Sequence, residues 1–198
     1  MPVPKRPVIL SLNDLRPVAL TSAVMKVRER VVLCKLDSLV RDYIDPLHFS
    51  YRRNRSTDGA VLYVLENIYS HLEKAGGSVR LMFFDFSSAF NTIQPHLLVQ
   101  KLLNMKFPSS VISWIFDYLI NRLQHVRLNG VLSSVICTNN GAPQGTVLGP
   151  FLLSLYTADC RSTDDSCPLV KFADNTELVG KKSVMMRVRY TTNRLKTL

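Results

Sequence analysis

Two aspartates occupy contexts in which a carboxylate is costly unless something compensates it. Asp85 directly follows the apolar run VRLMFF at 79–84, and Asp174 lies between two apolar runs in LVKFADNTELVG at 169–180. A carboxylate at the tip of an apolar strand requires solvent, a cation or a hydrogen bond. If the two strands are neighbours in one sheet, the carboxylates converge and can bind Mg²⁺ or Mn²⁺, the ions of two-metal phosphoryl transfer. The alternative is that each aspartate merely caps a turn.

A glycine-rich loop lies between these aspartates in the sequence. GAPQGTVLGP at 141–150 contains three glycines and two prolines and precedes an expected helix. Glycines let a backbone approach a ligand closely, and a helix N-terminus attracts phosphate. Alone this signal is weak. Between a strand ending in Asp and a hairpin carrying Asp, it favours a site for a phosphorylated ligand.

The elements that must position these residues follow from periodicity and turn signals. A long amphipathic helix is expected over 21–44, with Val24, Val27, Val31, Cys34 and Leu39 at helical spacing. The other expected elements are a helix from Ser56 or Thr57 to about Lys74, a buried strand at 79–84, helices from Pro95 and over 109–121, a hairpin at 125–137 around Asn129-Gly130, a helix over 151–159, and a second hairpin at 169–180. This order predicts an α+β fold with an antiparallel sheet.

Composition restricts the class of protein. The chain has 198 residues, of which 46% are hydrophobic and 20% charged, so it can fill a core and is not intrinsically disordered. Its longest apolar stretch is far below the ~20 residues of a membrane span, and MPVPKRPV does not resemble a secretory signal. Four scattered cysteines and four scattered histidines argue against a disulfide framework and a zinc hydrolase. Reduced thiols in an intracellular protein are expected.

The net charge of +10 favours a polyanionic partner, nucleic acid ahead of an acidic membrane. The first 60 residues carry 11 basic and 6 acidic side chains, and the last 18 carry 6 basic and no acidic ones. The middle of the chain is close to neutral. The candidate carboxylates therefore lie between two basic ends.

Three ordered motifs resemble those of the reverse transcriptase domain of LINE-type (non-LTR) retrotransposons. FFDFSSAFNTI (83–93) resembles the first palm motif, NNGAPQGTVLGPFLLSLYTAD (139–159) the PQG motif, and KFADNTELVG (171–180) the FADD hairpin. Upstream, NDLRPVALTSAVMKVRERVV (13–32) and HFSYRRNRSTDGAV (48–61) resemble finger motifs. The resemblance covers about residues 3–180.

This resemblance implies an RNA-directed DNA polymerase with the α+β right-hand fold. A single domain over 1–198 is expected, with fingers at about 1–78, palm at 79–180, a finger-like insertion near 95–140, and a basic tail at 181–198 in place of a thumb. The implied cofactors are two Mg²⁺ or Mn²⁺ ions. The implied partners are an RNA template, a DNA primer and dNTPs, without a membrane. The implied location is the nucleus, the cytoplasm or both.

The resemblance also assigns roles to individual residues. Asp85, Asp174 and Asn175 are the expected catalytic residues, and Asp85, Asp174 and the carbonyl of Phe86 the expected metal ligands. Phe90 is expected to clash with a 2′-hydroxyl and so select deoxynucleotides, with ordinary core packing as the alternative. The expected nucleotide-binding residues are Arg52, Ser88, Ala89, Phe90, Gln144 and Gly145, and the expected nucleic-acid-binding residues are Lys5, Lys26, Arg53 and Arg55. An arginine-rich loop is often only a solvated surface.

The chain departs from the family pattern at residue 175. Asn175 stands where a second Asp is usual, which removes one negative charge and predicts weaker metal binding. A catalytically impaired nucleic-acid-binding remnant is therefore the alternative function, and a fragment without function is a third. Asp164-Asp165 lie in a polar segment and are expected to be a loop rather than the missing pair.

Overall fold

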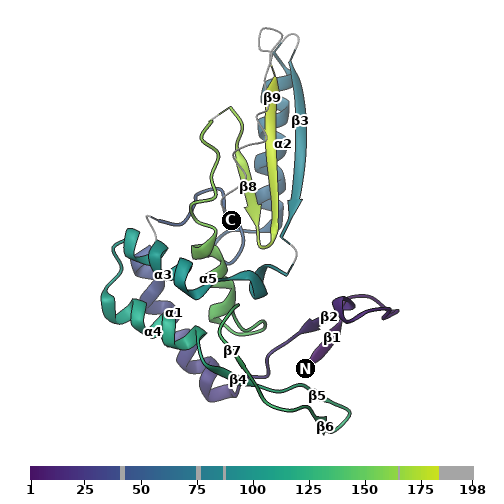
Figure 1. Ribbon diagram of the computed structural model, residues 1–198. Helices are drawn as coiled ribbons and strands as arrows, with labels where there is room; N and C mark the ends of the chain where they lie inside the picture. The colour runs from purple at the N-terminus through teal and green to yellow at the C-terminus, as the bar shows by residue number, and fades with distance from the viewer. Residues whose placement is uncertain (41–42, 75–76, 87, 165, 183–198) are drawn as a thin grey trace.

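The computed structural model describes residues 1–40, 43–74, 77–86, 88–164 and 166–182 (Figure 1). Its helices are α1 (Ala23–Val40), α2 (Thr57–Leu72), α3 (Pro95–Asn104), α4 (Ser109–Leu119) and α5 (Leu148–Tyr156), with short 3-10 turns η1 (Leu12–Asp14) and η2 (Ala89–Thr92). Its strands are β1 (Pro2–Pro4), β2 (Leu15–Pro17), β3 (Ser78–Asp85), β4 (Arg122–Gln124), β5 (Arg127–Leu128), β6 (Val131–Leu132), β7 (Ile136–Thr138), β8 (Leu169–Phe172) and β9 (Asn175–Lys182). The basic tail expected over 181–198 lies outside the described residues from 183 onward.

The central sheet has the strand order β3-β9-β8 and is antiparallel. β8 and β9 form the predicted second hairpin, with Ala173 and Asp174 in its turn. β3 pairs with β9 along its whole length, from Ser78 opposite Lys182 to Asp85 opposite Asn175. Figure 1 shows that the end of β3 and the turn of the hairpin lie at the same end of the sheet, toward α5. The predicted α+β class with an antiparallel sheet is confirmed.

The predicted first hairpin is an exposed ribbon that extends from the helical part of the molecule. β5 and β6 are joined by Asn129-Gly130, whose φ angles of 50° and 82° are the two positive values of a type I′ turn. Further out from the turn, β4 pairs with β7. The local turn signal thus determined this element correctly.

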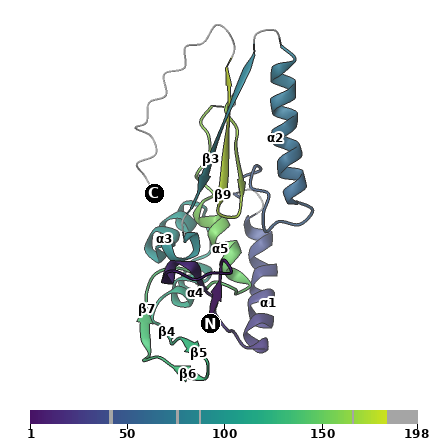
Figure 2. The same ribbon diagram turned by 90° about the vertical axis from the view of Figure 1, so that its right-hand side faces the viewer.

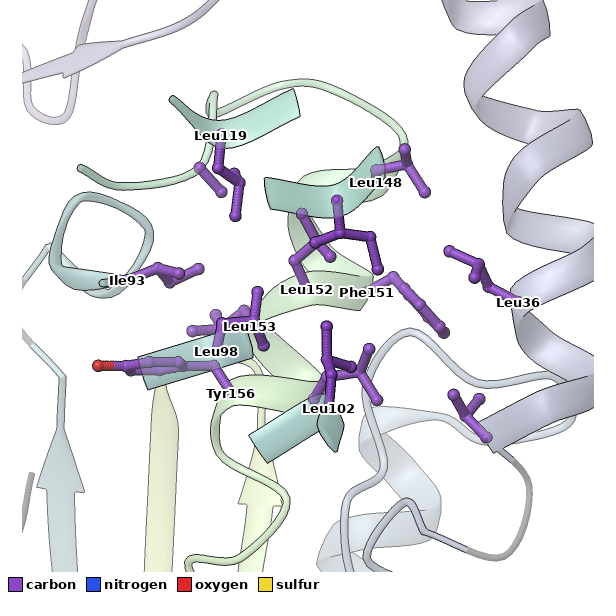
Figure 3. Packing of buried hydrophobic residues seen from close by; sticks show 14 of the residues in the cluster. Leu36, Ile93, Leu98, Leu102, Leu119, Leu148, Phe151, Leu152, Leu153 and Tyr156 are labelled. Carbon is purple, nitrogen blue, oxygen red and sulfur yellow. The ribbon is translucent and has the colours of Figure 1, made fainter. Parts of the chain in front are cut away.

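The larger hydrophobic core surrounds α5. All residues of α5 except Pro150 are buried, and α1, α3 and η2 contact it. Leu36 of α1, Leu98 and Leu102 of α3, and Leu119 of α4 fill the space around it (Figure 3). Each such leucine contributes on the order of 1.5–3 kcal/mol when its side chain is fully buried, so this core anchors the loop that leads into α5.

A second, smaller core lies between α2 and the sheet. Val170 of β8 and Val179 of β9 pack with Ala60 and Val64 of α2 and with Phe49. Figure 2 shows α2 running along one face of β3 and β9. Ser56 begins α2 by accepting a hydrogen bond from the Gly59 N–H at 3.1 Å, as an N-cap residue does. Among the described residues, no helix has the length and apolarity needed to cross a bilayer.

The predicted apolar face of the first helix was wrong. The five residues Val24, Val27, Val31, Cys34 and Leu39 are exposed. The helix instead buries Glu29, Leu36 and Val40, which also lie on one helical face. The cause is the position of α5, which contacts α1 on that face.

Two further predictions need correction. The strand β3 is not buried, since Leu81, Met82 and Phe83 are exposed. Successive side chains of a strand point to opposite faces of the sheet, so both faces of β3 are uncovered at these residues. The helix expected from Phe151 begins at Leu148 and includes Gly149 and Pro150 in its first turn. A proline is tolerated there because its missing N–H has no partner within the helix.

Candidate active site

Asp85 and Asp174 are brought together because β3 and β9 are paired neighbours. The register sets Asp85 opposite Asn175, and the N–H of Phe86 donates to the carbonyl oxygen of Asp174 at 3.0 Å. Asp85 is exposed and Asp174 half-buried. The convergence expected from the sequence is confirmed at the level of the backbone, and both acidic residues lie at one end of the sheet.

The turn that carries Asp174 is held by the segment that follows His48. Ala173 has a φ of 58°, and its N–H donates to Ser50 Oγ at 2.7 Å. Burial raises the pKa of Tyr51, and the charge of Asp174 raises it further, so this phenol lies within electrostatic range of the carboxylate. The arginine-rich loop therefore begins directly beside the hairpin turn.

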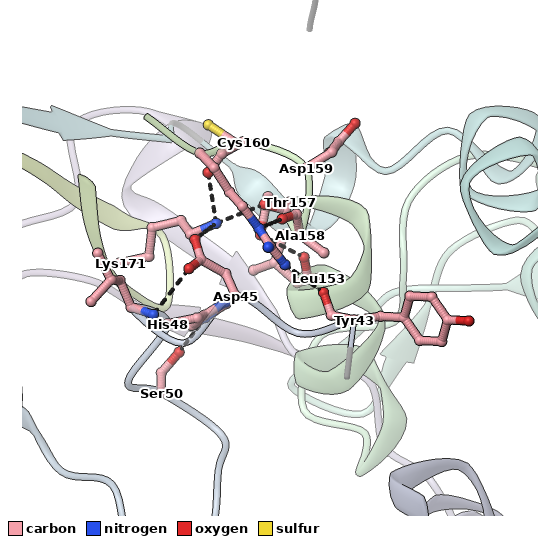
Figure 4. A network of polar contacts seen from close by, with 12 residues as sticks. Tyr43, Asp45, His48, Ser50, Leu153, Thr157, Ala158, Asp159, Cys160 and Lys171 are labelled. Atoms are coloured by element: carbon pink, nitrogen blue, oxygen red, sulfur yellow. Dashed lines mark hydrogen bonds and ion pairs between the residues drawn. The ribbon is translucent and has the colours of Figure 1, made fainter. Parts of the chain in front are cut away.

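A buried polar network joins this segment to the hairpin and to the end of α5 (Figure 4). Lys171 Nζ contacts Asp45 Oδ2 at 2.8 Å and donates to the carbonyl oxygens of Thr157 at 2.9 Å and Cys160 at 2.8 Å. His48 Nε2 and Ser50 Oγ form a hydrogen bond of 2.8 Å. Burial lowers the pKa of His48 to about 4, and the positive charge of Lys171 acts in the same direction. His48 is therefore neutral at pH 7.

The glycine-rich loop is attached to the segment that follows Asp85. The N–H groups of Gly141 and Ala142 donate to the carbonyl oxygens of Ile93 and Phe90, both at 2.7 Å. Gly141 has a φ of 73°, and a Cβ at this position would lie 2.9 Å from Asn91 Cα. Only glycine fits this approach, which places the loop beside residues 89–93.

The middle of the loop is fixed by the N-terminal segment. The Ala19 N–H donates to the Gln144 carbonyl oxygen at 2.7 Å. Gly145 has a φ of 89°, and its Cβ would come within 2.9 Å of Val18 Cγ1. Gln144 is half-buried and Gly145 exposed, so both can be reached from solvent while their backbone stays in place.

The three residues expected beside the nucleotide after Phe86 differ in environment. Ser88 is exposed and has a φ of 58°, whereas Ala89 is buried in the larger core. Phe90 is half-buried and packs against that core, so core packing is part of its environment. Phe90 is joined to the glycine-rich loop through its carbonyl oxygen.

The basic candidates fall into two groups. Arg52 is half-buried and donates to the carbonyl oxygen of Asp45 at 3.1 Å, while Arg53 and Arg55 are exposed, Arg55 lying over the ring of Phe49. These three belong to the loop beside the hairpin turn. Lys5 and Lys26 are exposed residues of the N-terminal arm and of α1, and neither takes part in the ion pairs found among the described residues.

Other acidic residues do not complete the site. Within the described ranges, no three or more His, Cys, Asp or Glu side chains are grouped so as to hold a metal ion. Asp164 lies in a loop and accepts hydrogen bonds from the N–H and hydroxyl of Ser166, as expected from its polar surroundings. Asp165 lies outside the described residues.

Sequence reasoning missed the residues that support the site. Lys171 and Ser50 were not singled out, although a lysine inside the apolar strand LVKF was a signal that a buried partner must exist. Ser50 carries no such signal, since its hydrogen bond reaches a residue 123 positions away. Glu29 and Arg122 contact the glycine-rich loop. They were also missed, because their partners in the loop lie far from them in the sequence.

Comparisons with known proteins agree with this arrangement. Residues 3–191 match the family described as reverse transcriptase (RNA-dependent DNA polymerase). A probable RNA-directed DNA polymerase from transposon BS of Drosophila melanogaster is 30% identical over 151 residues, which are 75% of this chain and 16% of that protein. The RNA-directed DNA polymerase from the mobile element jockey of the same species is 26% identical over 184 residues, 88% of this chain and 20% of that protein. The chain thus spans a fifth or less of these relatives.

Solved structures show the same fold at low sequence identity. Apo telomerase from Candida tropicalis, truncated from its C-terminal domain, superimposes with a TM-score of 0.55 and 14% identity, covering 79% of this chain and 34% of that one. Telomerase from Candida albicans in complex with a TWJ fragment of telomeric RNA gives a TM-score of 0.52 and 12% identity, covering 79% and 28%. The resemblance to reverse transcriptases of LINE-type elements, predicted from three motifs, is confirmed. The chain belongs to the reverse transcriptase family.

Proposed function

We propose that this chain is an RNA-directed DNA polymerase domain of a non-LTR retrotransposon, which adds dNTPs to a DNA primer on an RNA template. One observation carries the proposal. The paired ends of β3 and β9 bring Asp85 beside Asp174, and the segment after Asp85 is hydrogen-bonded to the loop of Gln144 and Gly145. The acidic residues that two-metal nucleotidyl transfer requires are thus connected, through the segment after Asp85, to a glycine-rich loop.

The oxygen donors at this site fit Mg²⁺ or Mn²⁺. Asp85, Asp174 and the carbonyl oxygen of Phe86 are the proposed ligands of two ions. Mg²⁺ is usually bound through one or two carboxylates together with substrate phosphates, so a pair of aspartates is a sufficient protein contribution. When bound, such ions activate the primer hydroxyl and neutralise the triphosphate.

Other residues position the substrates. Residues 79–180 are proposed as the palm, with an insertion near 95–140, and residues up to about 78 as the fingers. The loop that begins beside the hairpin turn carries Arg52, Arg53 and Arg55. These arginines are proposed to bind phosphates of the nucleotide or template. Gln144 and Gly145 are proposed to line the nucleotide, and Phe90 to exclude a 2′-hydroxyl. An intracellular site of action, in the nucleus or cytoplasm, follows from such substrates.

Primer extension on poly(rA)/oligo(dT) with Mg²⁺ or Mn²⁺ tests this function. We expect dTTP incorporation by the chain and its loss, by about a thousandfold or more, in Asp85→Asn and Asp174→Asn, because each removes a charge at the reacting phosphate. Asp117→Asn is the matched control, since Asp117 is an exposed carboxylate of α4, and it should keep full activity. No product with either metal from folded protein would contradict the proposal.

A non-catalytic nucleic-acid-binding domain is the second candidate, favoured by Asn175. The register sets this neutral amide directly opposite Asp85, where an aspartate would add negative charge for a cation. This candidate predicts RNA binding with a steep salt dependence that is unchanged in Asp85→Ala. Absence of RNA binding at low salt would exclude it.

A further inference from the structure

We infer that Glu29 is a positioning residue which holds the glycine-rich loop in place from α1 and thereby sets the affinity for the incoming nucleotide. The inference rests on the proposed function and deepens it. Glu29 is completely buried, and none of the ion pairs among the described residues includes it. A buried carboxylate without a cationic partner must be stabilised by hydrogen bonds.

The donors to Glu29 are the backbone of the loop and one tyrosine. Oε2 accepts from the N–H of Val147 at 2.6 Å and of Leu148 at 3.3 Å, and Oε1 accepts from the Tyr118 hydroxyl at 3.1 Å. Burial raises the pKa of Tyr118 to about 12, so its hydroxyl remains a donor. The negative charge also lies at the N-terminus of α5, where the helix dipole favours it.

These contacts complete the start of α5. The first N–H groups of a helix lack intrahelical partners. Here Glu29 accepts hydrogen bonds from the N–H groups of Val147 and Leu148. Thr146 Oγ1 accepts one from the Gly149 N–H at 3.1 Å, and Pro150 has no N–H group. Thr146 also donates to the Pro143 carbonyl oxygen at 2.8 Å. Moving the Glu29 carboxylate therefore shifts the residues directly after Gln144 and Gly145.

Arg122 holds the other end of the same loop. Its guanidinium donates to the carbonyl oxygens of Asn140 at 2.5 Å and Gly141 at 2.7 Å, and to Leu119 at the end of α4 at 3.0 Å. A cation thus binds the carbonyl groups at the start of the loop, and an anion binds the N–H groups at its end. Between these two ends lie Gln144, which is half-buried, and Gly145, which is exposed, so a ligand can reach both residues.

The single tryptophan provides a direct reporter of this arrangement. Trp114 stacks on Tyr118, with ring centroids 5.6 Å apart and an interplanar angle of 16°. Because Glu29 contacts the loop and Tyr118 donates to Glu29, a change in the loop reaches Trp114 through these two side chains. Binding of dTTP with Mg²⁺ should therefore change the fluorescence of the chain.

The test compares Glu29→Ala, Glu29→Gln and Tyr118→Phe with wild type. We expect Glu29→Ala to raise both the KM for dTTP and the Kd from Trp114 fluorescence about tenfold or more, because two backbone donors lose their acceptor. Tyr118→Phe removes one donor while keeping the ring and should raise both about threefold. Glu29→Gln keeps an oxygen for the N–H groups and should restore most of the affinity. Asp37→Asn, an exposed acid on the same helix, is the matched control.

The outcomes separate this inference from the proposed function. Unchanged KM and Kd for dTTP in Tyr118→Phe and in folded Glu29→Ala, with only fewer active molecules by active-site titration, would overturn the positioning role. A Glu29→Ala variant that does not fold leaves Tyr118→Phe to decide. Wild-type protein that binds dTTP in a Glu29-dependent manner but extends no primer would refute the polymerase activity and retain the inference. Wild-type protein that does not bind dTTP would refute both.

Discussion

Asn175 is the residue on which the affinity of the proposed metal site depends most directly. It lies opposite Asp85 in the β3–β9 register. An aspartate at this position would repel Asp85, because like charges directly opposite each other in a sheet are destabilising unless a cation lies between them. Its amide oxygen can still ligate a cation, but it contributes no charge. Asn175 therefore avoids charge repulsion in the metal-free protein. For the same reason, it makes the free energy of metal binding less favourable than an aspartate would.

Asn175→Asp should reverse this balance. Without metal, we expect a Tm about 2–4 °C below wild type, which corresponds to roughly 1 kcal/mol of repulsion in a chain of this size. Saturating Mg²⁺ should raise the Tm of the variant more than that of wild type, because binding to the folded state adds stability, and primer extension should increase.

Asn104→Asp is the control for that experiment. It adds the same charge at the exposed end of α3, outside β3 and the hairpin turn, and the rise in its Tm with Mg²⁺ should equal that of wild type. Equal rises in Tm with Mg²⁺ for Asn175→Asp and wild type would contradict a role of residue 175 in the proposed metal site.

At the scale of elements, the hydrogen-bonded contact between the segment at 45–50 and the β8–β9 hairpin depends on a neutral histidine. His48 is buried, with Nε2 hydrogen-bonded to Ser50 and with no hydrogen-bond partner for Nδ1 among the residues that the structure describes. Ser50 in turn accepts from the N–H of Ala173 in the hairpin turn. Protonation of His48 would place a positive charge near Lys171.

Stability should therefore fall as the pH drops below about 6.5. The folded pKa of His48, about 4, lies below the unfolded value near 6.5. Between these values the unfolded chain binds the extra proton, so each pH unit costs up to about 1.4 kcal/mol. Urea unfolding measures the free energy of unfolding at pH 7 and pH 5. The difference between these two values should be smaller for His48→Gln than for wild type. His125→Gln, at an exposed histidine, should retain the wild-type difference.

Local sequence signals predicted where helices, strands and turns form. Contacts between residues far apart in the sequence determined which faces of these elements are buried. The turn at Asn129-Gly130 and the cap of α2 are encoded within a few residues. The turn was predicted from the sequence, and the cap was predicted at Ser56 or Thr57, of which the structure shows Ser56. The buried face of α1 was not predictable, because it includes the carboxylate of Glu29, whose partners lie 118 and 119 residues away. The exposure of β3 depends on which elements cover the two faces of the sheet, which no local pattern contains. The convergence of Asp85 and Asp174 was predictable once both strands were placed in one sheet.

At the scale of the whole molecule, the two cores are connected through the buried ion pair of Asp45 and Lys171. Lys171 belongs to β8 of the sheet, whereas its carbonyl acceptors Thr157 and Cys160 directly follow α5 of the larger core. Asp45 precedes Phe49, which packs in the smaller core. The end of the sheet that carries Asp174 is thus tied to the helix that follows the glycine-rich loop.

Removing the charge of Asp45 should therefore destabilise the molecule far more than removing that of Asp159. Both aspartates pair with a lysine, at 2.8 Å and 2.6 Å, but the Asp45 side chain is 5% exposed and that of Asp159 60%. Asp45→Asn leaves the Lys171 ammonium buried without its counter-charge and should cost about 3–5 kcal/mol. Asp159→Asn should cost at most about 1 kcal/mol. Urea denaturation of both variants at pH 7 measures the difference. Equal losses would mean that the Lys171 carbonyl contacts alone join the two cores.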